Sequence, residues 1–122
     1  MAKDLRVSYL LDFYGELLTE KQRESLDCYY NQDLSLGEIG ENLNITRQGV
    51  RDNIKRAEAI LFEMEEKLGL AKKFSLINDK LEDIKKHIYI IDQRNMRVYR
   101  SNDINESIKV ILKDLDKLDK LI

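Results

Sequence analysis

A short polar and basic stretch in the middle of the chain carries the side chains best suited to binding a charged ligand. These side chains are Arg47, Gln48, Arg51, Lys55 and Arg56. Arginine donates paired hydrogen bonds to guanine edges or to phosphate, glutamine can pair with adenine, and lysine suits phosphate contacts that hold register. Four positive charges and one negative charge, that of Asp52, give residues 47–56 a local net charge of +3. We therefore predict that these five side chains contact nucleic acid.

The residues around this stretch predict a helix-turn-helix, in which a tight turn joins a short helix to a second helix. Ser35 and Glu38 form the pattern of a capping box, which opens a short helix ending near Leu43. Thr46 is a good N-cap for the helix that follows. The apolar residues that the two helices should share are Ile39, Leu43, Ile45, Val50 and Ile54. Gly40 should let the helices approach closely, because it has no side chain.

Two further helices are predicted before this motif. The first covers residues 5–18, where apolar residues recur at helical spacing. Its expected buried face consists of Tyr9, Leu10, Phe13, Tyr14, Leu17 and Leu18. Thr19 and Gln22 form a second capping box, so another helix should run from there to about Tyr30, with Leu26, Tyr29 and Tyr30 also facing inward. The tyrosines of these two helices, Tyr9, Tyr14, Tyr29 and Tyr30, are interpreted as core residues with surface hydroxyls. The alternative is that they are platforms for stacked bases.

A long helix is predicted from residue 47 to residue 68. Its apolar residues, separated by steps of 4, 3, 4, 3 and 4, are Val50, Ile54, Ala57, Leu61, Met64 and Leu68. Its solvated face should carry Glu63, Glu65 and Glu66. Gly69 fits the position just after a helix end, and the phase of the apolar pattern changes there. A new helix should therefore begin at about Leu70.

Heptad spacing continues through the C-terminal part of the chain. The helix after Gly69 has apolar residues at Leu70, Phe74, Ile77, Leu81, Ile84, Ile88 and Ile91. A last helix, capped by Asp103 together with Glu106, has Ile104, Ile108, Ile111, Leu115, Leu118 and Ile122. Such heptads predict a coiled-coil-like hairpin or an intermolecular bundle. Residues 92–103 look irregular, and segments 88–91 and 96–100 could instead pair as a short β-hairpin.

Together these elements predict an all-α fold, with a helix-turn-helix domain over residues 1–69 and a C-terminal helical arm over residues 70–122. The apolar heptad positions of the arm are too many to leave in water, because each Leu or Ile contributes roughly 1.5–3 kcal/mol when fully buried. The arm should therefore pack on its own domain or pair with another chain. We favour the second arrangement, which makes the protein a homodimer.

Composition narrows the classes of function. The chain has 122 residues, of which 43% are hydrophobic, and no apolar run approaches the roughly 20 residues that a membrane span needs. The N-terminus lacks the apolar run of a signal peptide, so we expect a cytoplasmic protein with no membrane association. Residues 1–70 carry 9 basic and 14 acidic residues, a net charge of −5. Attraction to nucleic acid should therefore be local, weak and strongly dependent on salt.

Catalytic and metal-binding patterns are absent from the sequence. Cys28 and His87 are the single cysteine and the single histidine, whereas a zinc site needs about four ligands. We expect Cys28 to be a small buried residue and His87 to lie exposed on a helix. Glycine-rich phosphate loops and nucleophile elbows are also missing. We therefore expect no enzymatic activity, no metal and no cofactor.

Two resemblances fit these residues. Residues 18–59 resemble the fourth conserved region of bacterial sigma factors in the segments 18–23, 35–39, 46–50 and 54–56. The chain is more similar to the YlxM family of small helix-turn-helix proteins. Its hallmarks fall at residues 9–14, 17–23, 29–30, 34–39, 47–48, 52–56 and 65–68, and the resemblance covers residues 5 to about 75.

The resemblance implies a regulatory protein that binds nucleic acid, either DNA or the RNA of the signal recognition particle. The genes of this family lie beside those of the signal recognition particle GTPase, which suggests a role in that pathway with the GTPase as a partner. The alternative is a protein-interaction adaptor that uses the helix-turn-helix as a scaffold. The chain departs from the family pattern at Gly40 and Gly49, where Ala is usual, and at Arg51, where Tyr is usual.

Overall fold

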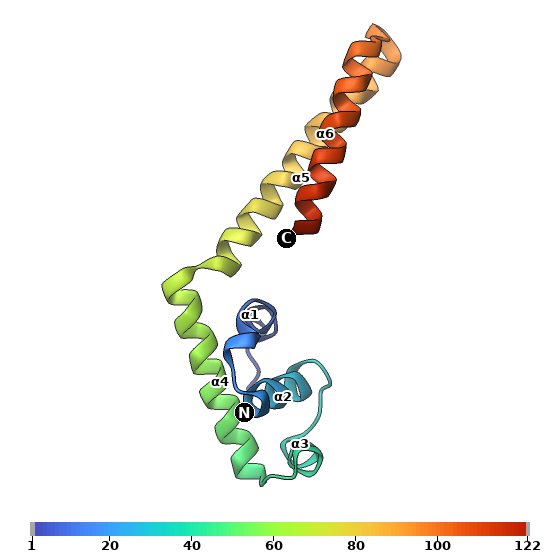
Figure 1. Cartoon of the computed structure of the whole chain (residues 1–122). Helices are drawn as coiled ribbons and strands as arrows, with labels where there is room; N and C mark the ends of the chain where they lie inside the picture. Colours follow the sequence, from blue (N-terminus) through green and yellow to red (C-terminus); the bar gives the residue numbers. More distant parts are fainter. Residues whose placement is uncertain (1, 122) are drawn as a thin grey trace. The chain divides into compact units, whose positions relative to one another are not determined.

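The computed structural model of the chain describes residues 2–121, and within that range every regular element is helical (Figure 1). Its elements are α1 (Arg6–Tyr14), η1 (Gly15–Leu17), α2 (Glu20–Tyr30), α3 (Leu36–Leu43), α4 (Arg47–Leu68), α5 (Leu70–Arg94), η2 (Asn95–Tyr99) and α6 (Asn102–Leu121). This confirms the predicted all-α fold with a helix-turn-helix. The chain divides into two compact units between Ala71 and Lys72, so that α5 begins in the first unit and continues in the second.

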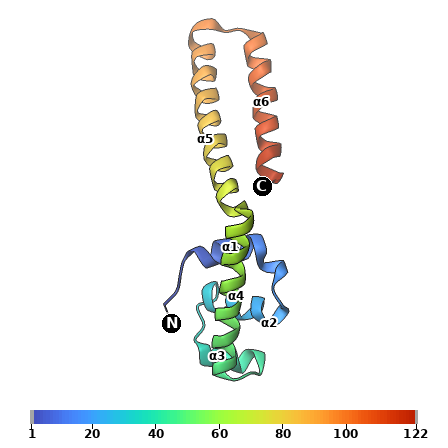
Figure 2. The same cartoon turned by 90° about the vertical axis from the view of Figure 1, so that its left-hand side faces the viewer.

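In the N-terminal unit, α4 packs against α1, α2 and α3 (Figure 2). Its inward stripe of Val50, Ile54, Ala57 and Leu61 is fully buried. The other buried residues of this core are Val7, Leu10, Leu11, Tyr14, Leu18, Leu26, Cys28, Tyr29, Ile39 and Ala71. Each helix buries one apolar stripe, as the heptad-like steps in the sequence predict. The core therefore lies between α4 and the three shorter helices.

The predicted helix starts are confirmed by side-chain caps. The Thr19 hydroxyl accepts from the Gln22 N–H at 3.3 Å, and the Gln22 side chain accepts from the Thr19 N–H at 3.1 Å. Ser35 and Glu38 make the same reciprocal pair at 3.1 and 3.2 Å. These contacts satisfy backbone donors that a helix cannot satisfy by itself. The N-terminal ends of α2 and α3 are therefore determined by local sequence.

The first helix differs from the prediction. It ends at Tyr14 and continues as the single 3-10 turn η1. The expected burial of Tyr9 and Leu17 is wrong, since they are 43% and 61% exposed, whereas Val7 and Leu11 are buried. Two overlapping apolar stripes run along this segment, both at helical spacing, and tertiary packing selects the one that faces α4.

The break between α4 and α5 falls at Gly69, as predicted. Gly69 takes a left-handed conformation with φ of 64°, and its N–H donates to the Glu65 carbonyl at 2.8 Å. The Tyr14 hydroxyl donates to Glu65 Oε1 at 2.8 Å and accepts from the Leu70 N–H at 3.1 Å. Glu65 Oε1 also accepts from the Ala71 N–H at 3.0 Å. The expected solvated role of Glu65 is therefore wrong, because this carboxylate caps the start of α5 from within the fold.

Burial and the Glu65 carboxylate together raise the pKa of Tyr14. A similar contact occurs at Tyr30, whose hydroxyl donates to Glu58 Oε1 at 2.6 Å and accepts from the Asp4 N–H at 3.2 Å. Burial and the Glu58 hydrogen bond raise the pKa of Tyr30 to about 12. Both hydroxyls therefore stay protonated well above neutral pH and act as fixed donors between helices.

In the C-terminal unit, α5 and α6 run side by side in opposite directions (Figures 1 and 2). Leu81, Ile108 and Leu115 are buried between them. The Lys85 ammonium donates to the Asp119 carboxylate and so joins the two helices. The structure therefore shows the helical hairpin that was one of the two predicted arrangements. Ile122, the last predicted heptad residue, lies outside the described residues. Within residues 2–121, no helix is both long enough and apolar enough to span a membrane.

The connection between α5 and α6 corrects two predictions. The alternative of a β-hairpin is wrong, because residues 88–91 belong to α5 and residues 96–99 to the π-helical turn η2. Asp103 is not the cap of α6, since the Ile104 N–H donates to the Ser101 hydroxyl at 3.3 Å. The β-branched composition of these segments was outweighed by the apolar helical pattern, which continues into the turn.

Replacing Tyr14 with Phe should destabilise the N-terminal unit. The change removes the hydroxyl that bridges Glu65 and Leu70 and leaves a partly buried N–H unpaired, which costs about 1–3 kcal/mol. Urea unfolding followed by circular dichroism measures the loss. Tyr99→Phe is the matched control, because Tyr99 is exposed in the C-terminal unit. Equal stability of the two variants would contradict this account of the α4–α5 break.

Candidate nucleic-acid interface

The turn between α3 and α4 is held by a close backbone approach. Asn44 ends α3 in a left-handed conformation with φ of 56°, and the Ile45 N–H donates to the Gly40 carbonyl at 3.0 Å. A Cβ built on Gly40 would lie 2.8 Å from the Ile45 carbonyl oxygen. Glycine at this position therefore allows the close passage that the prediction attributed to it.

The start of α4 is capped as predicted. The Thr46 hydroxyl accepts from the Gly49 N–H at 2.9 Å. The positive end of the dipole of this 22-residue helix lies at the same place, beside Arg47 and Gln48. Phosphate groups bind favourably at helix N-termini because backbone N–H groups point toward them. The first turn of α4 is therefore electrostatically suited to an anion.

All five side chains predicted to contact nucleic acid are exposed on α4, namely Arg47, Gln48, Arg51, Lys55 and Arg56. Residues four apart on a helix lie in one row, so one row holds Arg47, Arg51 and Lys55. The adjacent row holds Gln48, Asp52 and Arg56. The second row lies opposite the buried stripe that begins at Val50, and the first row flanks that stripe, with Arg47 nearest to it. Within the described part of the chain, the four cationic side chains make no ion pair.

One contact within this surface was not anticipated from the sequence. The Gln48 amide donates to Asp52 Oδ1 at 3.1 Å, and Asp52 is itself exposed between Gln48 and Arg56. The four-residue spacing of amide and carboxylate could have indicated it. The contact orients Gln48, and it places a negative charge on the surface that would face phosphate. Asp52 would therefore repel a polyanion placed against this surface.

The remaining candidate side chains lie elsewhere. Tyr14 and Tyr29 are buried, which leaves no free ring face for a stacked base, and Tyr14 keeps its hydroxyl inside the fold rather than at the surface. Cys28 is also buried, as predicted, and burial raises the pKa of its thiol. His87 is exposed on α5. Among residues 2–121, no three His, Cys, Asp or Glu side chains gather as a metal site would require.

The fold and this surface together define a helix-turn-helix protein. A family model described as "Putative helix-turn-helix protein, YlxM / p13 like" matches residues 1–101, and the chain belongs to that family. The match extends through α5 and its turn, which is further than the resemblance to about residue 75 seen in the sequence motifs.

Relatives from several bacteria support this membership. A protein from Acetivibrio thermocellus is 46% identical over 122 residues, which is 100% of this chain and 98% of the relative. One from Halalkalibacterium halodurans is 52% identical over 86 residues, covering 70% of this chain and 79% of the relative. One from Bacillus cereus is 40% identical over 119 residues, covering 98% and 99%. All three carry the name "UPF0122 protein".

Two alanine substitutions in α3 should have opposite effects on stability. Alanine in a helix interior is favoured over glycine by about 1 kcal/mol. Gly37→Ala should realise part of this gain, because Gly37 lies in the first turn of α3 and its new Cβ meets only the Ser35 hydroxyl at 3.9 Å. Gly40→Ala should lower the melting temperature, because its Cβ would press on the Ile45 carbonyl. Thermal melts that place Gly40→Ala at or above Gly37→Ala would contradict the close-approach argument.

Proposed function

We propose that this protein is a helix-turn-helix regulator that binds nucleic acid through the outer face of α4. The observation that carries the proposal is the exposure of Arg47, Gln48, Arg51, Lys55 and Arg56 on that face, with the four cations left without protein partners among the described residues. Unpaired arginine and lysine side chains are available to replace counterions at phosphates. The proposal is of a non-enzymatic cytoplasmic protein that needs no cofactor.

The five side chains divide by position along α4. In a helix-turn-helix, the first residues of the second helix reach base edges, and residues further along contact the backbone. Arg47, Gln48 and Arg51 are therefore proposed to read bases, with Gln48 exchanging its Asp52 contact for a base. Lys55 and Arg56 are proposed to contact phosphate. DNA is the first ligand to test and the RNA of the signal recognition particle is the second.

A homodimer is proposed through one side of the C-terminal hairpin, here called the open face. It consists of Ile77, Ile84, Ile91, Ile104, Ile111 and Leu118. Ile91 and Ile111 remain 48% and 39% exposed, and both line a surface groove of about 260 Å³. Pairing two such hairpins into a four-helix bundle would bury these side chains, because their spacing is that of a heptad seam. A dimer also carries two α4 helices, as paired half-sites require.

The same open face supports a second candidate function, that of a protein-interaction adaptor. In that case a surface of a different protein, rather than a second copy of this chain, covers the open face. The GTPase of the signal recognition particle is the proposed partner, on the strength of the family resemblance alone. The oligomeric state of the purified protein separates the two candidates, because the adaptor reading needs an open face that is free to accept the partner.

Removing two arginines should weaken nucleic-acid binding. Arg47→Ala/Arg51→Ala should lower affinity at least ten-fold at low salt, since each base contact contributes about 1–3 kcal/mol. Gel-shift titrations with DNA and with signal recognition particle RNA measure the effect. Lys113→Ala/Lys117→Ala removes the same charge from exposed sites on α6 and should change affinity little. Asp52→Asn should instead strengthen binding, because it removes the negative charge from the contact surface.

Failure of the wild-type protein to bind either nucleic acid at low salt would overturn the proposed function. Equal losses in the α4 variant and the α6 control would also count against it, because a general charge effect needs no α4 interface.

Charge on the open face should dissociate the dimer. Sedimentation at micromolar concentration should show a dimer for the wild type and a monomer for Ile91→Lys/Ile111→Lys. Leu76→Lys/Val110→Lys is the matched control, because these exposed apolar residues lie outside the open face. The control should remain dimeric, and circular dichroism should show both variants helical. A wild-type monomer would exclude the proposed homodimer and leave the adaptor as the candidate.

A further inference from the structure

Arginine is segregated at the tip of the C-terminal hairpin, defined here as residues 89–100. Residues 72–122 contain nine lysines and three arginines, and all three arginines, Arg94, Arg97 and Arg100, fall within seven positions of the tip. All three are exposed. Several lysines of the same unit pair with carboxylates, as Lys85 does with Asp119, whereas the arginines have no ion pair within residues 2–121.

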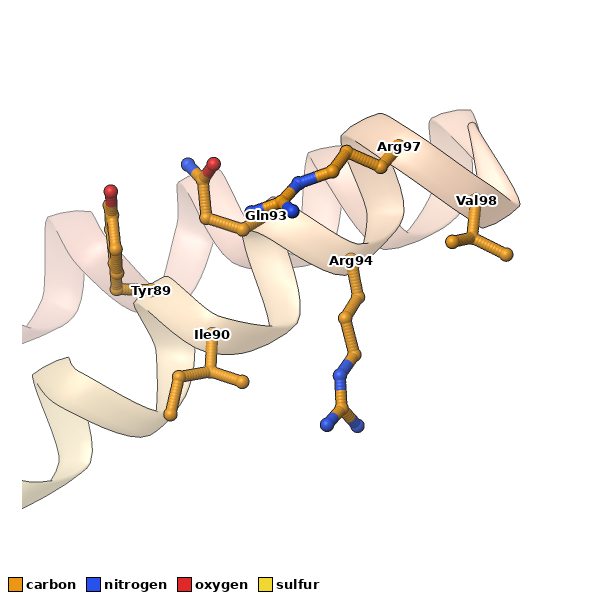
Figure 3. Close-up of a pocket in the computed structure, with 6 residues that line it drawn as sticks. All are labelled: Tyr89, Ile90, Gln93, Arg94, Arg97 and Val98. Carbon is orange, nitrogen blue, oxygen red and sulfur yellow. The ribbon is translucent and has the colours of Figure 1, made fainter.

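Large apolar side chains surround these arginines in solvent. Tyr89, Met96, Val98 and Tyr99 are each more than 60% exposed, at 64%, 63%, 69% and 67%. A surface pocket of about 320 Å³ lies among Tyr89, Ile90, Gln93, Arg94, Arg97 and Val98 (Figure 3). In that view, Arg94 and Ile90 project from one side of the helix, and Tyr89 and Gln93 from the other. The tip therefore combines an apolar pocket with guanidinium groups.

The tip is a fixed structure rather than a loose loop. Asn95 is 4% exposed, its amide donates to the Ser101 carbonyl at 3.0 Å, and its oxygen accepts from the Ser101 N–H at 2.9 Å. The Arg100 N–H donates to the Asn95 carbonyl at 2.6 Å, with Arg100 in a left-handed conformation of φ 49°. These contacts close the π-helical turn η2, an element that is rare and is often found at functional sites.

The pocket and the open face have no residue in common. Ile90 lies two residues from Ile88, which is about 200° around an α-helix of 3.6 residues per turn. Ile88 belongs to the side of α5 that meets α6, because it shares a groove with Ile108 and Ile111. The pocket therefore faces away from the partner helix.

We propose that the hairpin tip binds a segment of a partner protein that presents a large apolar side chain flanked by Asp or Glu. Arginine, tyrosine and methionine are enriched where proteins bind proteins, and guanidinium groups pair bidentately with carboxylates. The three arginines and the one acidic residue, Asp92, give the tip a net charge of +2. That charge selects an acidic partner. Ile90 and Val98 favour a peptide over nucleic acid, because their aliphatic groups contribute nothing at a phosphate.

A random 12-residue peptide library displayed on phage tests this proposal against the immobilised full-length chain. Soluble Arg94→Glu/Arg97→Glu protein is added in excess, so that only peptides that need the arginines are retained. The expected result is enrichment of peptides with a large apolar residue within about three positions of Asp or Glu. A synthetic copy of an enriched peptide, followed by fluorescence anisotropy, should bind the Arg94→Glu/Arg97→Glu variant at least ten-fold more weakly.

Two further variants separate the contribution of the apolar pocket to peptide binding from that of a general change in charge. Ile90→Ala/Val98→Ala should also weaken peptide binding, because it empties the apolar pocket, while Lys113→Glu/Lys117→Glu should bind normally. All these positions are exposed, so circular dichroism should show unchanged folding. Enrichment of no tip-dependent peptide, or of peptides without carboxylates, would overturn the proposal. It would also be overturned if oligo-uridine RNA or anionic vesicles bound the tip more tightly than any enriched peptide.

Discussion

The rotation of α4 about its own axis is the constraint on which the N-terminal unit depends. Val50, Ile54, Ala57 and Leu61 lose all solvent exposure against the three shorter helices. A rotation by one residue would move each of them by about 100° and would bring charged neighbours such as Arg51 into the core. The energy that holds the core together therefore also determines that Arg47, Arg51 and Lys55 project outward. In this protein, the rotation of α4 about its axis determines both which side chains form the core and which side chains form the candidate interface.

A second constraint acts at the far end of the same helix. Gly69 alone could permit many directions for the chain that follows, because glycine has wide conformational freedom. The Leu70 N–H donates to the Tyr14 hydroxyl and the Ala71 N–H donates to Glu65, so backbone groups that would otherwise be unpaired where the helix breaks are satisfied. A side chain from α1 thus caps a helix that begins 56 residues later. This contact accounts for the place of Leu70 and Ala71, the first two residues of α5, in the N-terminal unit, while the rest of that helix belongs to the hairpin.

Features set by local sequence could be predicted, and features set by competition between surfaces could not. Capping boxes at Thr19 and Ser35 join residues three apart, so they are visible without any tertiary structure. The stop at Gly69 was predictable for the same reason. The buried side of α1 was not, because two apolar stripes overlap there and only contact with α4 selects between them. The role of Glu65 depended on a residue 51 positions away. On α4, exposure of the five predicted residues follows from the apolar spacing, and the contact between Gln48 and Asp52 joins residues four apart, so local spacing indicates it as well.

The charge of the N-terminal part limits how any α4 interface can work. Residues 1–70 carry a net charge of −5, so long-range attraction toward a polyanion is weak and binding must rely on the local excess between Arg47 and Arg56. A single weak site gains most from being linked to another, since a second binding event within one assembly proceeds at a high effective concentration. The unburied heptad residues of the hairpin supply a physical reason for two chains to associate. On this argument, the proposed dimer is what would make a weakly basic helix an effective nucleic-acid-binding surface.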